Sequence, residues 1–237
     1  MNYFTYKNYI ECIHTFRLNA VLQLAEDSVK YRTRKDKIEY TYEKILGKIL
    51  KQKEEVVNII NEYIKPKDKI TKENLDKYEI VSKKFKLKSS EIIYKLKNKE
   101  MFFLIEHQSK IDTNMPYKIL NSCVDIIQEW KKEKEMTKIK EYPLIVPIVI
   151  YTGKEKWNIQ ENIKEKQMKY VNVEKYRIDL KYNLIDINKI SISKLEKDKS
   201  IFSNMIMYKK SENKEKAINK LEKVITQEEK EELLKII

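Results

Sequence analysis

Two stretches of sequence decide the fold: Phe85-Lys-Leu-Lys-Ser-Ser-Glu-Ile-Ile-Tyr-Lys-Leu96 and Met101-Phe-Phe-Leu-Ile-Glu-His-Gln108. Apolar residues recur along both, and a short polar segment around Asn98-Lys99 separates them. Apolar runs joined by a polar turn that contains Asn are typical of a β-hairpin. With Asn98-Lys99 as a two-residue turn, the pairing register places Glu91 directly opposite Glu106.

The second run changes abruptly from apolar to polar at its end. Side chains alternate between the two faces of a strand, so Glu106 and Gln108 share one face while His107 points to the other. Opposed Cβ atoms on paired strands are roughly 4.5 to 5.5 Å apart, and like charges there destabilise a hairpin. Glu91 and Glu106 therefore predict a divalent cation between them, or a proton on one carboxylate. A longer turn would shift the register and leave Glu91 in solvent instead.

Hydrophobic periodicity predicts the elements around this hairpin. The continuous apolar run Leu144–Tyr151 is typical of a strand that is covered on both faces, and a further strand is expected within residues 176–187. The expected helices span residues 1–35, residues 40–64 ending before Pro66, residues 116–134, and parts of the highly charged segment 191–237. This order of elements predicts an α/β domain with a mixed β-sheet flanked by helices.

The chain is basic, with 50 Lys and Arg against 37 Asp and Glu and a formal net charge of +13. This excess favours binding to a polyanion such as DNA. Only four of the basic residues are Arg, and this bias toward Lys, Ile and Asn points to an AT-rich bacterial genome. Two cysteines in a chain of 237 residues indicate reduced thiols and a cytoplasmic protein.

Several classes of protein and of catalytic site find no support in the sequence. No apolar run approaches the roughly 20 residues that a membrane span needs, and the first residues do not have the pattern of a signal peptide. The sequence contains no glycine-rich phosphate loop, no Cys-x-x-Cys and no His-Glu-x-x-His. Its two histidines, His14 and His107, argue against a histidine-rich zinc site and a Ser-His-Asp triad.

Three blocks of sequence resemble a known family: Phe102–Asp112, Asn114–Lys118, and Pro143–Gly153 with Trp157. They are similar to the recombination-promoting nuclease and putative transposase family, which belongs to the PD-(D/E)xK nuclease superfamily. The resemblance covers residues 42 to 190. It implies a restriction-endonuclease-like core and a DNA endonuclease that depends on Mg²⁺, with Mn²⁺ as a substitute. The implied role is DNA recombination or the movement of mobile elements.

The resemblance also assigns roles to individual residues. Glu91 and Glu106 match the metal ligands, and Gln108 matches the residue that orients the attacking water. The remaining implied site residues are Glu43, as an additional acid near the metal, and Lys110 and Lys118, as contacts to the DNA backbone. Glu91 and Glu43 stand where the family has aspartates, so each carboxylate reaches one methylene further than usual.

On this interpretation the chain has three parts. Residues 1–35 form an N-terminal amphipathic helix, residues 36–190 the PD-(D/E)xK nuclease-like domain, and residues 191–237 a charged helical segment. The helical ends suit a homodimer interface, although the N-terminal helix fits an edge of the sheet equally well. Two other functions remain open: a catalytically inactive relative that binds nucleic acid or a partner protein, and a purely structural partner that assembles through its C-terminal segment.

Overall fold

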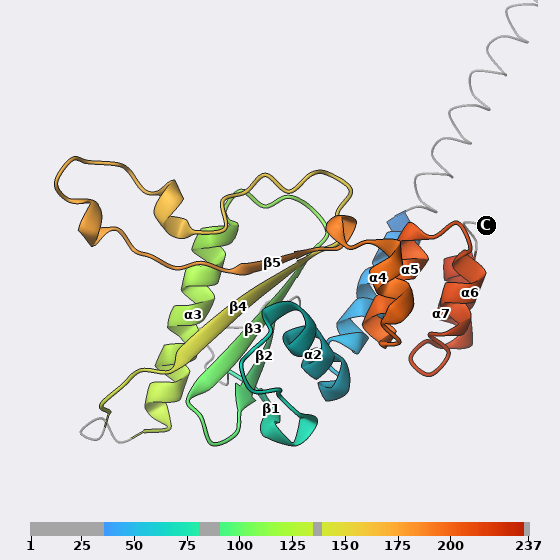
Figure 1. The fold of residues 1–237 in the computed structure, drawn as a ribbon, viewed down its shortest axis with the longest axis horizontal. Coiled ribbons are helices and arrows are strands. Elements are labelled where there is room, and N and C mark those ends of the chain that lie inside the picture. The colour runs from blue at the N-terminus through green and yellow to red at the C-terminus, as the bar shows by residue number, and fades with distance from the viewer. Residues whose placement is uncertain (1–35, 81–90, 135–138, 235–237) are drawn as a thin grey trace, which may run out of the picture.

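A five-stranded sheet forms the centre of the protein (Figure 1). The computed structural model describes residues 36–80, 91–134 and 139–234, so the helix predicted for residues 1–35 lies outside the described residues. The strands follow one another in chain order across the sheet: β1 (Leu75–Tyr78), β2 (Glu91–Leu96), β3 (Met101–Gln108), β4 (Leu144–Tyr151) and β5 (Asn183–Asp186). Strands β1 to β3 are antiparallel and β3 to β5 are parallel. The predicted α/β class with a mixed sheet is therefore confirmed.

The β2–β3 hairpin has the predicted register. Glu91 pairs with Glu106, and the ladder continues as far as Leu96 and Met101. Asn98 lies in the turn with φ of 60°, a left-handed conformation that Asn tolerates better than most residues. The turn between the strands therefore places the two carboxylates opposite each other, as the sequence predicts.

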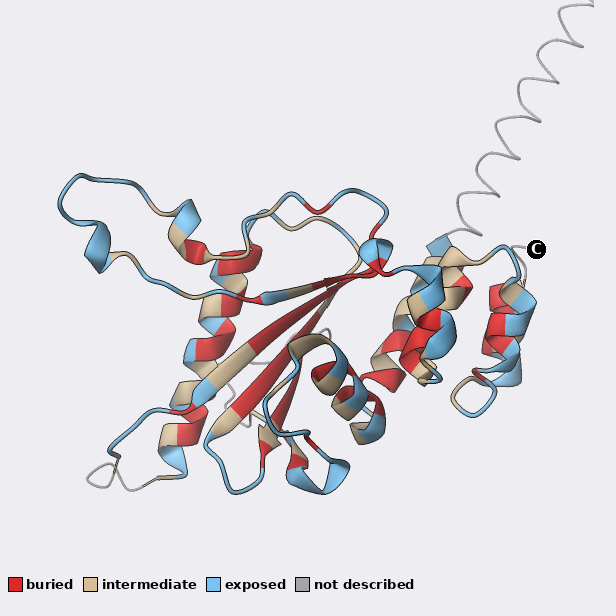
Figure 2. Cartoon of the chain, in the orientation of Figure 1, coloured by how far each residue is buried: buried red, intermediate tan, exposed pale blue. Residues whose placement is uncertain are grey.

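Each face of the sheet is covered by helices, which explains why β4 is a continuous apolar run. On one face, the helix α3 (Met115–Lys132) buries Ile119, Cys123 and Ile126 against Phe102 and Leu104 of β3. On the other face, the helix over residues 36–49 and the C-terminal helices share a second apolar core with alternate residues of the same strands. Figure 2 shows the buried residues along the strands between these layers.

The predicted helix over residues 40–64 forms with one interruption. The helix over residues 36–49 ends at a turn, and α2 (Lys53–Ile59) then continues into a π-helical turn, Ile60–Ile64. Lys65 has φ of 53° and ends the segment just before Pro66, whose ring cannot continue a helix. Strand β1 was not expected from the sequence, and β5 is shorter than the predicted 176–187.

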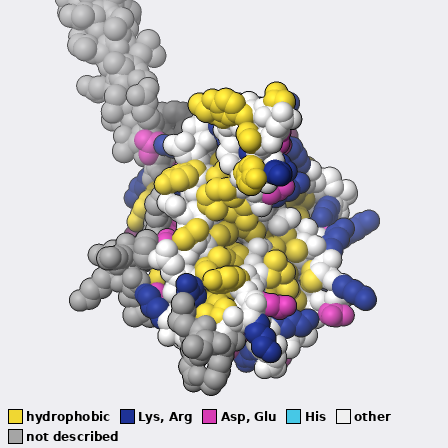
Figure 3. Space-filling model, turned by 90° about the vertical axis from the view of Figure 1, so that its left-hand side faces the viewer, with side chains coloured by type: hydrophobic (Ala, Val, Ile, Leu, Met, Phe, Trp, Pro, Cys, Tyr) yellow, Lys and Arg dark blue, Asp and Glu magenta, His cyan; other side chains and the backbone are white. Residues whose placement is uncertain are grey.

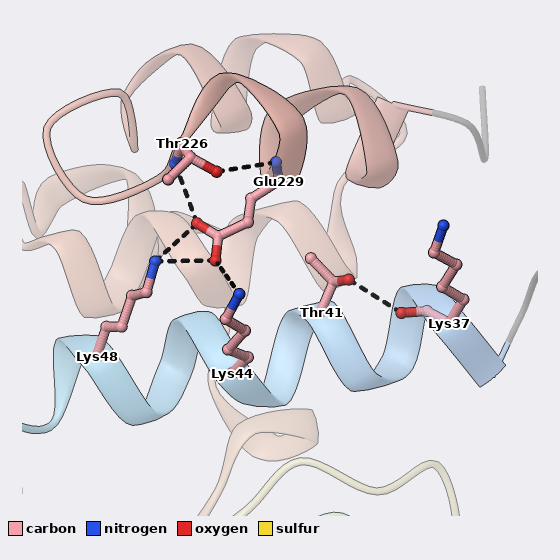
Figure 4. A network of polar contacts seen from close by, with 6 residues as sticks. All are labelled: Lys37, Thr41, Lys44, Lys48, Thr226 and Glu229. Carbon is pink, nitrogen blue, oxygen red and sulfur yellow. Dashed lines mark hydrogen bonds and ion pairs between the residues drawn. The ribbon is translucent and has the colours of Figure 1, made fainter.

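Four short helices make up the charged C-terminal segment: α4 (Ile192–Lys197), α5 (Ile201–Lys210), α6 (Lys214–Asn219) and α7 (Gln227–Leu234). These helices share the second apolar core with the helix over residues 36–49. Glu229 of α7 forms ion pairs with Lys48 at 2.8 Å and with Lys44 at 3.1 Å (Figure 4). In the described residues, no helix is long and apolar enough to cross a bilayer.

Replacing Glu229 with Gln is expected to destabilise the protein by about 2 kcal/mol at neutral pH. Burial opposes ionisation of Glu229, but hydrogen bonds from Lys48, from the backbone amide of Thr226 and from Lys44 outweigh it and lower its pKa to about 2. Because the folded-state pKa lies below the unfolded value, this stabilisation is present above about pH 4.5 and is lost as the pH falls toward 2.

Urea unfolding at neutral pH and at about pH 3.5 measures this effect. The difference between wild type and Glu229→Gln should shrink at the lower pH. Glu228→Gln, an exposed neighbour in the same helix, serves as the control and should change stability little. An equal loss at both pH values would mean that the charge of Glu229 contributes nothing.

Candidate active site at the end of strand β3

The face of the sheet under α3 carries a buried carboxylate. Glu106 is only 2% exposed, although the residue occupies the last part of β3. The side-chain amide of Gln108, on the same face, donates a hydrogen bond to Glu106 Oε1 at 2.5 Å. Because an amide is neutral, this contact orients the Glu106 carboxylate without balancing its charge.

The second carboxylate of the pair is held from α3. Ser122 Oγ donates a hydrogen bond to Glu91 Oε1 at 2.9 Å. One turn further along α3, burial and the negative charge of Glu91 both raise the pKa of Asp125. The helix α3 thus contributes a hydroxyl that holds Glu91 and a carboxyl group whose pKa is raised in part by Glu91.

A lysine from the first turns of α3 provides the positive charge at this site. Lys118 Nζ lies 3.8 Å from Glu106 Oε1 and 2.8 Å from Asp112 Oδ2. Asp112 belongs to the loop between β3 and α3 and accepts a hydrogen bond from the backbone amide of Asn114. Lys118, which was expected from the sequence only as a contact to the DNA backbone, therefore belongs to the Glu106 site.

The other site residues expected from the sequence lie elsewhere. Glu43 belongs to the helix that covers the opposite face of the sheet, and it lines a cavity of about 490 Å³ together with Ser109, Lys110 and Gly153. Within residues 36–80, 91–134 and 139–234, no three acidic, histidine or cysteine side chains gather closely enough to hold one metal ion. Glu43 thus lies on the helix that packs against the opposite face of the sheet, and its role as an additional acid stays a prediction.

His107 lies on the face opposite Glu106, as strand alternation predicts. Its Nε2 forms a hydrogen bond of 2.8 Å with Thr152 Oγ1. Burial and the nearby charge of Lys209 lower the pKa of His107 to about 4, against an opposing effect of Glu39. His107 is therefore neutral at pH 7, and its contacts connect β3 to the residue that follows β4.

Gly153 brings the ends of β3 and β4 together. A Cβ atom at this position would lie 2.3 Å from the Tyr151 hydroxyl oxygen and 2.5 Å from the carbonyl oxygen of Ser109. Such distances are too short for any side chain, so only glycine fits here. The segment Ser109-Lys110 that follows Gln108 is thereby fixed against the loop after β4.

The match to a family model covers all of these features. The model is described as putative transposase, YhgA-like, and it matches residues 41–235. The chain belongs to this family. The match includes the hairpin, α3, β4 and the C-terminal helices of this YhgA-like family member. Neither a curated protein nor a solved structure matches the chain.

Membership in a transposase family indicates a function related to mobile elements and an interaction with DNA. The restriction-endonuclease-like core and the superfamily assignment stay predictions. The same holds for the catalytic roles of Glu91, Glu106, Gln108 and Glu43.

Of the side chains that α3 contributes to the site, Lys118 was expected from the sequence, whereas Ser122 and Asp125 were not. Ser122 and Asp125 follow Lys118 by four and seven positions, which places all three on one face of a helix. That spacing was visible in the sequence. The strands that this face would contact were not, because contacts between a helix and a sheet depend on how the loop of residues 109–114 folds.

Proposed function

We propose that this YhgA-like family member is a metal-dependent DNA endonuclease that hydrolyses phosphodiester bonds in recombination or in the movement of mobile DNA. One observation carries the proposal: Glu91 and Glu106 face each other on paired strands, and Gln108 and Lys118 surround the buried Glu106 carboxylate. Paired carboxylates can bind a divalent cation, and such a cation is the central group of metal-assisted phosphodiester hydrolysis.

The donor set fits Mg²⁺. This ion prefers carboxylate oxygens and keeps several waters, so that one or two protein carboxylates together with substrate phosphate are sufficient to bind it. Glu91 and Glu106 would hold the ion, and no third acid among the described residues is needed. When bound, Mg²⁺ lowers the pKa of a coordinated water and offsets negative charge on the phosphate.

The remaining residues orient the reacting groups. Gln108 has an amide that can align the attacking water, since its hydrogen bond to Glu106 already holds it beside the carboxylate. Lys118 supplies a positive charge next to Glu106, which the neutral Gln108 cannot provide. Ser122 holds Glu91 in place through the hydrogen bond to its carboxylate.

A second candidate function is DNA binding without cleavage. The observation that favours it is the position of Lys118, because its ammonium group, 3.8 Å from Glu106 Oε1, offsets the charge of this carboxylate without a metal ion. In that case the carboxylate pair is a structural feature of the fold, and the basic surface alone engages DNA.

Supercoiled plasmid incubated with the full chain tests the proposal. We expect conversion to the nicked form in Mg²⁺ and in Mn²⁺, and no conversion in EDTA, because neither Gln108 nor Lys118 can replace the cation at the phosphate. Gel electrophoresis quantifies the nicked product. Retained DNA binding with no cleavage in either metal would instead support the second candidate.

A further inference from the structure

An arm of the chain, orange in Figure 1, extends outward near the N-terminal end of α3. We define it as residues 163–181, which lie between the loop after β4 and strand β5. Hydrogen bonds across its base hold the two sides together: Gln167 exchanges two with the backbone of Ile178, and Lys164 forms an ion pair with Asp179 at 2.9 Å. These contacts hold the two sides of the arm together at its base.

The outer part of the arm exposes apolar side chains. Met168 is 78% exposed and Val171 is 82% exposed, and the rings of Tyr170 and Tyr176 are also mainly in solvent. Figure 3, which faces the end of the molecule that carries α3 and the arm, shows hydrophobic side chains at the top, at the height of the arm, and continuing to the centre, with Lys and Arg near the rim. Exposed apolar groups gathered in this way mark a surface that another molecule covers.

Basic residues flank these apolar side chains. Within residues 166–177 there are four, Lys166, Lys169, Lys175 and Arg177, against the single acid Glu174, which leaves a net charge of +3. Lys166, Lys169 and Lys175 form no ion pair with any residue that the structure describes. Lys175 instead lies over the Tyr176 ring, with Nζ 5.1 Å from its centroid.

We infer that the arm binds duplex DNA outside the cleavage site, with its lysines on phosphates and Met168 and Val171 as an apolar wedge in the minor groove. Proteins that kink DNA combine basic contacts with exposed aliphatic side chains inserted between base steps. A second copy of this chain is a less suitable partner, because a charge of +3 on each arm and +13 on each chain would oppose self-association. The inference rests on the proposed function in taking DNA as the substrate.

The first test measures the charge contribution to binding. A short fluorescent duplex is titrated with the full chain in Ca²⁺ at several salt concentrations, and Lys166→Gln/Lys169→Gln/Lys175→Gln is compared with wild type. Each lost phosphate contact lowers the salt-dependence slope by about 0.9, so we expect a loss of about 2 to 3 in the slope and about tenfold or more in affinity. Lys216→Gln/Lys220→Gln/Lys223→Gln removes the same charge from exposed positions of the C-terminal segment and controls for net charge.

Equal slopes for the two triple variants would overturn the inference, because only net charge would then matter. The second test uses Met168→Ser/Val171→Ser and a duplex labelled at both ends, so that energy transfer reports bending. Wild type is expected to bend the duplex and this variant to bend it less. If the variant bends DNA like wild type and only converts a sedimenting dimer to a monomer, the arm is a self-association surface.

These readouts are separate from catalysis. Arm-dependent binding and bending in a protein that does not nick plasmid would uphold the arm inference and reject the proposed nuclease. Nicking by a protein whose arm variants bind and bend like wild type would uphold the nuclease and reject the arm inference.

Discussion

Plasmid nicking is expected to fall at least about a hundredfold when Glu106 is replaced by Gln. The substitution keeps the shape of the side chain and leaves an oxygen that can accept the hydrogen bond from Gln108. It removes the negative charge that lies opposite Glu91 and beside Lys118. Affinity for DNA, measured in Ca²⁺, should be retained or increase, because the lost charge repels phosphate.

Two controls make this result interpretable. Glu215→Gln changes an exposed acid of α6 and should nick at the wild-type rate, while thermal unfolding of Glu106→Gln shows whether the variant is folded. Wild-type nicking by a folded Glu106→Gln protein would place the catalytic centre elsewhere. Glu43→Gln extends the comparison: a loss as large as that of Glu106→Gln would mean that the helix over residues 36–49 contributes to catalysis.

Gly153→Ala is expected to destabilise the protein by about 3 kcal/mol, the upper part of the range for overpacked sites. The added methyl group would overlap the Tyr151 hydroxyl and the Ser109 carbonyl oxygen. A side chain such as Tyr151 can move, but Ser109 can move only by shifting the backbone that follows Gln108. Nicking should therefore fall as well, even at temperatures at which the variant remains folded.

The other glycine of the chain provides a matched control for this substitution. Gly47 lies in the helix over residues 36–49, and a Cβ atom there would meet no atom within 4 Å. Gly47→Ala should stabilise the protein by about 0.5 to 1 kcal/mol, because glycine costs conformational entropy in a helix. Thermal unfolding of both variants measures these shifts. A Gly153→Ala protein as stable as wild type would show that the contact with Ser109 relaxes freely.

The register of the β2–β3 hairpin could be predicted from local sequence alone. Its register follows from the position of Asn98 and from strand alternation, and both are properties of neighbouring residues. The same reasoning places Glu106 and Gln108 on one face and His107 on the other, as the structure has them. The opposition of Glu91 and Glu106 could therefore be predicted without any knowledge of the remaining chain.

Contacts between residues far apart in the chain could not be predicted from local sequence patterns. Glu43 was expected near the two glutamates, but its helix packs against the opposite face of the sheet through Tyr42, Ile45 and Leu46. The partners of the site came from α3 instead, since Lys118 and Ser122 reach Glu106 and Glu91. Which helix covers which face is decided by connections and packing between layers, and those leave no local pattern.

The sequence by itself determined the α/β class, the hairpin register and the pair of opposed carboxylates, because turn chemistry and alternation act over a few residues. Tertiary structure alone decided that Lys118 lies beside Glu106, that Gly153 must lack a side chain, and that residues 163–181 extend as an arm. Each of these depends on contacts between segments brought together only when the sheet and its two helical layers are assembled.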